Sequence, residues 1–379
     1  MSGRPLAGLR VLELARILAG PWAGQVLADL GAEVIKVESP EGDDTRRWGP
    51  PFVETGGDRS AAYFHGTNRG KRSIALDFRE SGDLALVRDL VARADVVLEN
   101  FKVGGLRKYG LDHETLCAAH PKLVYCSITG FGQDGPYAGR AGYDYIIQAM
   151  SGLMSVTGEP DGQPQKVGVA VTDIFTGLYA SNAILAALYE RDRSGLGQHI
   201  DMALMDSAVA ITANQAMNYL ATGTPPRRLG NAHPNLVPYQ VFPCRDGWIV
   251  IAVGNDAQFG RLCGLLGCPD MASEPTAATN AARVENRATV TDRLNALTET
   301  CSKADLLSAC EGTGVPAGPI NDMAEVFADP QVVARGLRLA GDGPGVRPPF
   351  RFSRSDGVSD RPAPGLDADG ASIRQELKR

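Results

Sequence analysis

The sequence predicts an α/β protein with a mainly parallel sheet in a large domain and a second, smaller domain. Over residues 1–220, short apolar runs alternate with amphipathic segments, an order typical of strands and helices in parallel sheets. A length of 379 residues exceeds what one ordinary hydrophobic core accommodates. The run 222–235, rich in proline, glycine and asparagine, interrupts the alternation and marks a linker. We therefore expect a Rossmann-like large domain and a smaller α+β domain.

The large domain begins with a strand–helix–strand unit over residues 9–38. Its loop at 15–21 reads ARILAGP and lacks the G-x-G-x-x-G of dinucleotide binders, which weakens a nicotinamide-binding interpretation. Residues 39–72 are rich in glycine, aspartate and arginine and are expected to form a long surface loop. The expected strands cover residues 9–14, 33–38, 73–77, 95–99, 123–129 and 198–203. The expected helices cover residues 22–30, 81–94, 145–154, 173–191 and 206–220.

The smaller domain is expected to begin with strands over 239–253, followed by helices from about 256 to 310. A second linker-like run at 314–320 precedes a helix at 321–337, and the remaining proline- and glycine-rich chain reads as irregular. The predicted division is a large domain at 1–221, a linker at 222–238, a small domain at 239–325 and a returning segment at 326–379.

Composition narrows the class of protein. The net charge of −6 argues against a nucleic-acid binder. The seven cysteines are scattered without metal-ligand spacing and indicate reduced thiols, so we expect no metal site. No apolar run approaches the 18 residues of a membrane span. We therefore expect a cytoplasmic protein with no nucleic-acid or membrane partner.

Asp173 stands between the apolar run 167–171 and a helix expected to end near Arg191. Aspartate is a preferred N-cap residue, so a structural cap is the plain interpretation. A carboxylate nucleophile held on a rigid element is the alternative. The residues around Asp173 leave both interpretations open.

Gly104 and Gly105 follow an expected strand and precede a short basic helix with Arg107 and Lys108. Glycine beside a helix start lets backbone N–H groups approach a phosphate. An ordinary β–α turn explains the same residues.

Eight stretches, in order along the chain, together resemble the class III coenzyme A transferases. They read RVLELARILAGPWAGQVLADLGAEVIKVE, NRGKRSIALDF, VLENFKVGGL, YCSITGFGQDGP, AGYDYIIQAMSGLMSVTG, VTDIFTGLYA, GNAHPNLVPYQVF and GVPAGPIND. The resemblance spans about residues 5–355. It implies a large domain that takes both chain ends, an inserted small domain and a homodimer of two interlocked chains.

The same resemblance implies site residues. Asp173 stands where the transferases carry their nucleophile, and coenzyme A (CoA) would bind as a thioester, with no metal. CoA contacts are implied for Ile17, Leu18, Lys71, Arg72, Asn100, Phe101 and Lys108, with Tyr143 in the active-site segment. A dicarboxylic acceptor needs a cation for its distal carboxylate, and the candidates are Arg46, Arg47, Arg69 and Arg140. His233 lies in the linker at 222–238 and is either a site residue or a linker histidine hydrogen-bonded to the backbone.

Two differences from subgroups of this family narrow the expected activity. The family's racemases carry histidine where this chain has Tyr143, and that histidine is a proton-transfer base, which argues against a racemase or epimerase. The formyl-CoA enzymes carry glutamine where this chain has Leu18. The sequence is most similar to succinyl-CoA:dicarboxylate transferases, such as the succinate–hydroxymethylglutarate type. A non-catalytic CoA binder is a third hypothesis, against which the intact VTDIFTG segment speaks.

Overall fold

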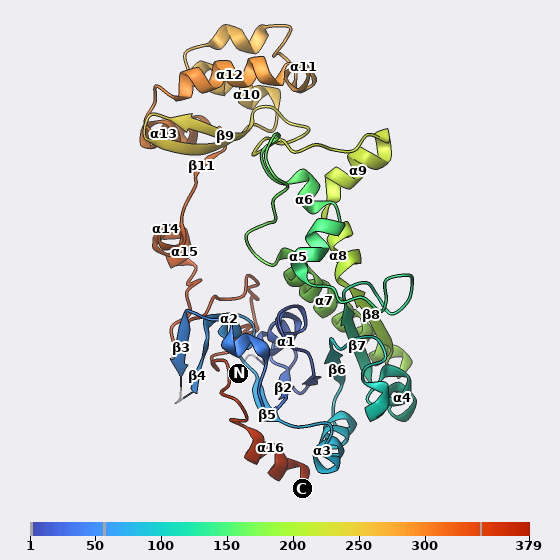
Figure 1. The fold of residues 1–379 in the computed structure, drawn as a ribbon. Coiled ribbons are helices and arrows are strands. Elements are labelled where there is room, and N and C mark those ends of the chain that lie inside the picture. The colour runs from blue at the N-terminus through green and yellow to red at the C-terminus, as the bar shows by residue number, and fades with distance from the viewer. Residues whose placement is uncertain (1–2, 56–57, 342) are drawn as a thin grey trace. The chain divides into compact units, whose positions relative to one another are not determined.

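The computed structural model describes residues 3–55, 58–341 and 343–379. The chain forms two compact units (Figure 1). The first contains residues 1–153, 166–222 and 330–379, and the second contains residues 154–165 and 223–329. The segment 154–165, placed in the large domain by the sequence analysis, therefore packs with the second unit.

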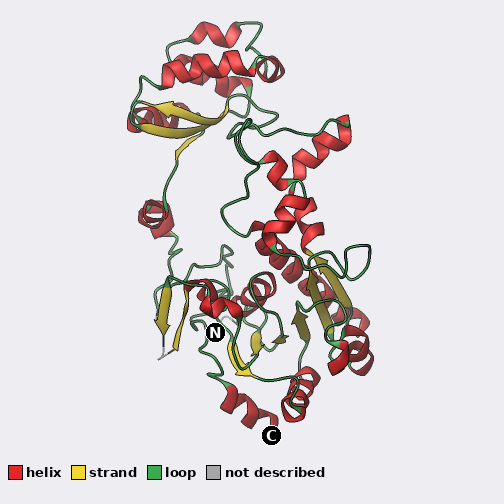
Figure 2. Ribbon diagram, in the orientation of Figure 1, coloured by secondary structure: helices red, strands yellow, loops and turns green. Residues whose placement is uncertain are grey.

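A six-stranded sheet within the described residues organises the first unit, and all of its neighbouring strands run parallel, as predicted. Its order is β5-β2-β1-β6-β7-β8. The strands are β1 (Arg10–Glu13), β2 (Glu33–Glu38), β5 (Arg72–Ala75), β6 (Val96–Glu99), β7 (Val124–Thr129) and β8 (His199–Ala203). Helices follow most of these strands along the chain (Figure 2).

Helices cover both faces of this sheet. Successive residues of a strand point to opposite faces, so neighbouring residues belong to different cores. Val11 and Val96 belong to the core that contains residues of α1 (Ala19–Asp29) and α7 (Val171–Ser194). Their neighbours Leu12 and Val97 belong to the opposite core. That core is completed by α3 (Ser81–Ala92), α4 (His113–Ala119) and α16 (Gly370–Leu377). The unit also contains α5 (Asp144–Met150), α8 (Leu204–Ile211), α9 (Ala213–Thr222) and α15 (Pro330–Ala334).

The sequence-based expectation for residues 39–72 is wrong where the structure describes them. They contain the 3-10 helix η1 (Asp44–Arg47), the hairpin β3 (Phe52–Thr55) and β4 (Asp58–Ala61), and α2 (Ala62–His65); residues 56 and 57 lie outside the description. Several polar side chains here are buried because they form internal ion pairs and hydrogen bonds. The C-terminal segment is also not wholly irregular, since α16 packs on α3 and β5 and buries Ile373. The basic segment after Gly105 is only the three-residue 3-10 helix η2 (Arg107–Tyr109).

The second unit has its own core, between a three-stranded antiparallel sheet and a set of helices. The strands are β9 (Tyr239–Cys244), β10 (Gly247–Ala252) and β11 (Ala317–Pro319). β11 corrects the linker expected at 314–320, because its residues pair with β10. The helices are α6 (Leu153–Val156), which straddles the boundary, α10 (Asp256–Leu265), η3 (Pro269–Ser273), α11 (Asn280–Glu285), α12 (Arg287–Thr298), α13 (Lys303–Thr313) and α14 (Met323–Ala328).

In the described part of the chain, one helix, α7, is long and apolar enough by length and composition to cross a membrane. Its residues Ala180, Ile184 and Ala187 are buried in the core of the first unit, and α1 packs along it. The apolar character of α7 is therefore explained by burial in the fold.

Candidate active site

The strand order reverses between β1 and β6, because β1 leads to β2 on one side and β6 leads to β7 on the other. Ligands of open parallel sheets bind at such a switch point, beyond the carboxyl ends of the strands. Asn100, just after β6, accepts a hydrogen bond from the Arg16 N–H at 3.0 Å and donates to the Arg16 carbonyl at 2.7 Å. Loop 15–21 and Asn100 are thus brought together, which places Ile17, Leu18 and Asn100 at one location.

Asp173 lies in the first turn of α7 but does not cap it, so the N-cap interpretation is wrong. The helix begins at Val171, and its N-cap residue Ala170 makes no side-chain bond. The cap comes from Asp144 of α5. Its Oδ1 accepts the Thr172 N–H at 2.8 Å, the Thr172 hydroxyl at 2.6 Å and the Asp173 N–H at 3.4 Å. The Asp173 side chain is therefore left available for another role.

Burial raises the pKa of Asp173 to about 7, and the nearby Asp144 carboxylate contributes to the rise. From the sequence, a helix N-terminus is expected to lower the pKa of an aspartate there, but in the fold desolvation and like charge dominate and raise it. A carboxyl group with such a pKa is a candidate functional group. In this environment Asp173 exchanges between its protonated and ionised forms near neutral pH.

Tyr63 of α2 faces these acids. Burial first, and then the charges of Asp173, Asp144 and Asp43, raise the pKa of Tyr63 to about 12. Its hydroxyl therefore stays protonated at neutral pH and can donate a hydrogen bond. Trp48 contacts Tyr63 edge-on, with ring centroids 5.3 Å apart. Both rings are partly exposed, so they line a surface that a substrate can reach.

The start of α1 crosses α7 one turn beyond Asp173. Gly177 permits this close approach, since a Cβ there would stand 2.6 Å from the Ala19 carbonyl oxygen and 3.0 Å from the Trp22 ring. The first N–H groups of a helix have no intrahelical acceptor. The N-cap residue of α1, Leu18, makes no side-chain cap bond. The crossing therefore brings the start of α1 against the turn of α7 that follows Asp173.

Phe101 and Lys108, two further predicted CoA contacts, are linked through aromatic packing. Phe78 stacks on Phe101 at 6.2 Å and contacts Tyr109 edge-on at 5.7 Å. The Lys108 ammonium lies over the Tyr109 ring at 4.7 Å. These residues follow β5 and β6 and form an apolar platform with a cation at its edge.

The structure does not present Lys71 or Arg72 to a ligand. Lys71 is fully buried, and its ammonium donates to Glu13, the Pro21 carbonyl and Asn68. Burial lowers its pKa to about 8. Arg72 is paired with Glu33 and Glu376. Both side chains hold the fold together, because their donors are already used.

Arg46 and Arg69 are likewise engaged in internal contacts. Arg46 pairs with Glu38 and Asp58 and donates to the Pro364 carbonyl. Arg69 pairs with Asp29 and donates to the Val346 carbonyl. It therefore attaches the C-terminal segment to the first unit.

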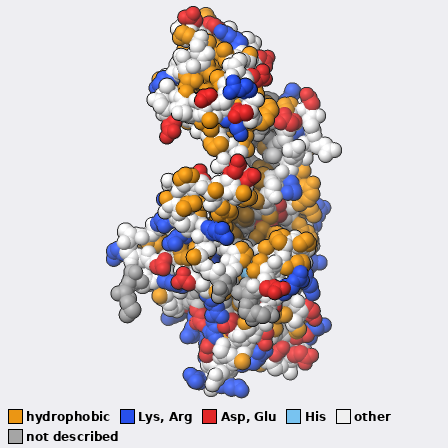
Figure 3. Space-filling model, turned by 90° about the vertical axis from the view of Figure 1, so that its left-hand side faces the viewer, with side chains coloured by type: hydrophobic (Ala, Val, Ile, Leu, Met, Phe, Trp, Pro, Cys, Tyr) orange, Lys and Arg blue, Asp and Glu red, His pale blue; other side chains and the backbone are white. Residues whose placement is uncertain are grey.

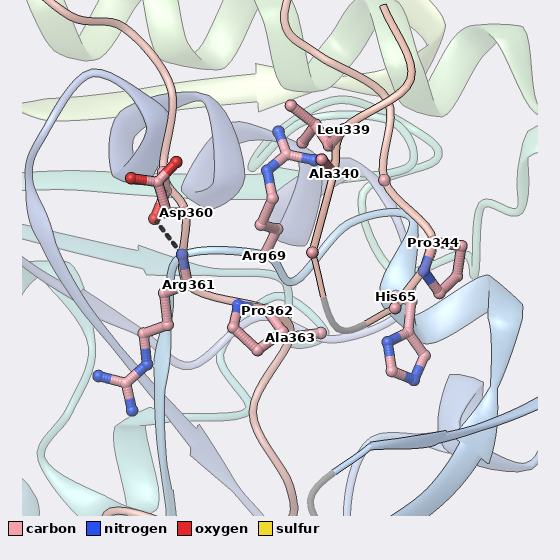
Figure 4. A pocket seen from close by; sticks show the side chains of 13 residues that line it. His65, Arg69, Leu339, Ala340, Pro344, Asp360, Arg361, Pro362 and Ala363 are labelled. Atoms are coloured by element: carbon pink, nitrogen blue, oxygen red, sulfur yellow. Dashed lines mark hydrogen bonds between the residues drawn. The ribbon is translucent and has the colours of Figure 1, made fainter.

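Figure 4 shows Arg69 beside Leu339 and Ala340, with Arg361 extending away from it. The cavity between these stretches has a volume of about 40 Å³, room for only a few water molecules. It does not have room for an acyl-CoA or a dicarboxylic acid.

The remaining candidates are more open. Arg47 is exposed and makes only a 3.5 Å contact with Asp44, and Arg140 stacks on Tyr137 at 3.9 Å. Tyr143 is 63% exposed and immediately precedes the capping Asp144. His233 belongs to the second unit, where its Nδ1 accepts the Asn235 N–H.

The sequence analysis missed Asp144, Tyr63 and Trp48 as site residues. Asp144 lies in the AGYD motif already noted for the family resemblance, and that was the available signal. Its 29-residue separation from Asp173 gives no local pattern. In the described ranges, no group of three or more His, Cys, Asp and Glu side chains is arranged to hold a metal ion.

Comparisons with known proteins show the family of the chain. The model of CoA-transferase family III matches residues 6–370. The chain is 60% identical to the succinate–glutarate CoA-transferase of Agrobacterium fabrum, covering 99% of this chain and 96% of that protein. It is 43% identical to the human succinyl-CoA:glutarate CoA-transferase, covering 99% and 86%.

A crystal structure of a CAIB/BAIF family protein from Brucella suis superimposes with a TM-score of 0.90 at 61% identity, covering 99% of this chain and 100% of that one. The sequence match over almost the whole chain and the shared fold lead to one conclusion. The chain belongs to CoA-transferase family III and is a CoA-transferase.

Proposed function

We propose that this enzyme moves CoA from succinyl-CoA to a dicarboxylic acid through a thioester formed on Asp173. The observation that carries the proposal is the Asp173 carboxyl, whose pKa burial raises to about 7, which no described side chain pairs, and whose charge acts on Tyr63. The similar proteins named above use succinyl-CoA or succinate with glutarate by their names. A mesaconate transferase of Haloarcula hispanica, 41% identical over 90% of this chain, supports a dicarboxylic acceptor.

In the proposed mechanism, an ionised Asp173 oxygen attacks the thioester carbonyl of the donor, and CoA leaves as a thiolate. The resulting mixed anhydride is attacked by that thiolate at the aspartyl carbonyl, which releases the donor acid and leaves aspartyl-CoA. The acceptor carboxylate then attacks the aspartyl-CoA carbonyl, which releases CoA thiolate and forms a second mixed anhydride. The thiolate attacks the acceptor carbonyl of this anhydride, which gives the acceptor acyl-CoA and releases the Asp173 carboxylate. Each addition creates an oxyanion, which the N–H groups at the start of α1 and the Tyr63 hydroxyl can stabilise.

Trapping with hydroxylamine tests the covalent intermediate. Hydroxylamine attacks anhydrides and thioesters but not a free carboxylate, so succinyl-CoA should cause a hydroxamate to form on the peptide containing Asp173. Peptide mass mapping with and without donor measures it. An active enzyme that gives no donor-dependent adduct, while a control thioester is trapped, would contradict the mechanism. A racemase, which works by proton transfer, gives no such adduct.

Arg47 is the proposed partner of the acceptor's distal carboxylate, because it directly precedes Trp48, which contacts Tyr63. Arg47→Gln should raise KM for glutarate about tenfold or more, the loss expected for one charge-assisted hydrogen bond, and leave KM for butyrate unchanged. Arg140→Gln is the matched comparison. Scanning acids against succinyl-CoA by mass spectrometry gives both values. Equal KM increases for the mono- and dicarboxylic acids would remove Arg47 from this role.

A homodimer is proposed from the apolar surface of the first unit. Tyr145, Tyr189, Met217 and Leu220, from α5, α7 and α9, are each about half or more exposed. Further apolar side chains reach the surface on the face drawn in Figure 3. Exposed apolar areas of this kind mark interaction surfaces. Light scattering at low micromolar concentration should give about twice the chain mass of 40.1 kDa, and a value near 40.1 kDa would refute the dimer.

A further inference from the structure

Loop 15–21 is held through its backbone at several points. The Lys36 ammonium donates to the Ala15 carbonyl at 2.8 Å, and the Lys71 ammonium donates to the Pro21 carbonyl at 2.8 Å. Asn100 binds both the N–H and the carbonyl of Arg16. The two lysines also share the Glu13 carboxylate beneath the loop. Fixing so many backbone groups of one short loop indicates that its conformation matters.

Ile17, in the middle of this loop, has a φ of 73°. This is the left-handed region, which costs energy for any L-residue and is an outlier for a β-branched one. Such strain persists only where the surroundings over-determine it, and it concentrates at functional sites. Holding Ile17 in this conformation therefore lowers the stability of the folded chain.

Asp43 is the group that binds Ile17 in this conformation. Its two carboxylate oxygens accept the Ile17 N–H at 3.3 and 3.2 Å. The Asp43 side chain is buried, and its Oδ2 lies 2.9 Å from the Lys36 ammonium. Its Oδ1 accepts the N–H and the hydroxyl of Thr45 at 3.0 and 2.8 Å. Lys36, itself fully buried, thus fixes the carboxylate that fixes Ile17.

The opposite charges of Asp43 and Lys36 stabilise each other. Burial favours the neutral form of Asp43, but the Lys36 charge and the Thr45 hydrogen bonds outweigh it and hold the pKa of Asp43 below its ordinary value. Burial likewise favours neutral Lys36, and the Asp43, Glu13 and Glu38 carboxylates outweigh it and raise the pKa of Lys36. Both groups therefore remain charged at neutral pH.

The backbone direction at Ile17 decides where α1 points its first N–H groups. Leu18 is the N-cap residue of α1 and makes no side-chain cap bond. Ala19 lies against Gly177, one turn from Asp173. A different φ at Ile17 would change the direction in which the chain enters α1 and so move these N–H groups relative to α7.

We propose that Asp43, anchored by Lys36, is a positioning residue that forces Ile17 into the left-handed conformation and so aims the N–H groups of α1 at the reacting carbonyl on Asp173. The inference rests on the proposed function of Asp173. Asp43 itself does not touch the substrate. Its contribution is to preorganise the donors that stabilise the oxyanion.

A double-mutant cycle with Ile17 and Asp43 tests this. Asp43→Asn in the wild-type background should lower kcat about 100-fold, the effect expected from misplacing donors by about 1 Å, with little change in KM for the acyl-CoA. Glycine adopts positive φ without strain. In an Ile17→Gly background, the same Asp43→Asn change should therefore cost less than about tenfold. Glu41→Gln, at an exposed acid two residues before Asp43, is the matched control and should change kcat about twofold at most.

Equal losses in the two backgrounds would overturn the proposal, because a purely structural role of Asp43 is not relieved by glycine at position 17. If Asp43→Asn gives no folded protein, the melting temperatures of Ile17→Gly and Ile17→Ala test whether Ile17 is strained. Strain at Ile17 requires Ile17→Gly to melt at a higher temperature than Ile17→Ala, the reverse of the usual order, and the usual order would refute it. Hydroxylamine trapping of wild type reports separately on Asp173, so a failure of the proposed function is distinguishable from a failure of this inference.

Discussion

Replacing Asp173 by asparagine should abolish CoA transfer and at the same time stabilise the protein at pH 8. The amide cannot form the anhydride, so we expect a loss of at least about 10³-fold, the scale seen when a nucleophile is removed. The stabilisation follows from the pKa of Asp173, which burial and Asp144 raise to about 7 from an ordinary 3.8. The unfolded chain ionises Asp173 near its ordinary pKa and the folded chain does so only near 7.

The sign follows from proton binding. Between about pH 4 and 7 the folded state holds one more proton than the unfolded state, so wild-type stability falls as pH rises through this window. Above it, ionised Asp173 costs about 2–4 kcal/mol, which asparagine avoids. The melting temperature of Asp173→Asn should therefore exceed that of wild type by several degrees at pH 8 and equal it near pH 4.

Thermal melts at the two pH values, together with transfer assays, measure both effects. Asp192→Asn, at the exposed far end of α7, is the control and should change neither. Transfer within tenfold of wild type in Asp173→Asn would remove Asp173 from the mechanism. A lower melting temperature at pH 8 would show that the folded protein prefers the ionised form.

Replacing Asp144 should separate two roles, because its carboxylate both caps α7 and raises the pKa of Asp173. Asp144→Ala leaves the N–H and hydroxyl of buried Thr172 without their acceptor. We expect it to destabilise the protein by roughly 0.5–2 kcal/mol, the usual cost of a lost cap, and to lower activity by loosening the first turn of α7.

Asp144→Asn keeps an acceptor for Thr172 but removes the charge. The pKa of Asp173 should then fall while burial still keeps it above its ordinary value. Because ionised Asp173 is the proposed nucleophile, kcat/KM of wild type should rise with pH and level off above about 7. The rising limb should move to lower pH in Asp144→Asn. A profile that stays in place would show that Asp144 does not act on Asp173 through charge.

The sequence by itself determined the parallel sheet of the first unit. Strands such as Val96–Glu99 and Val124–Thr129 are mostly apolar, because helices cover both faces of the sheet and nearly every strand residue is buried. It also singled out Asp173 through the family resemblance, together with loop 15–21 and Asn100, which follow the two strands that meet at the switch point. These features are local in sequence, so their pattern is readable.

The tertiary structure alone decided which charges are free and which are bound. Lys71, Arg46 and Arg69 are candidate ligand contacts by sequence, but in the fold each pairs with a buried carboxylate and is unavailable to a ligand. The Asp173 side chain stays available because Asp144, 29 residues earlier, caps α7 in its place. Pairing, desolvation and the strained φ of Ile17 depend on distances that only the folded chain sets.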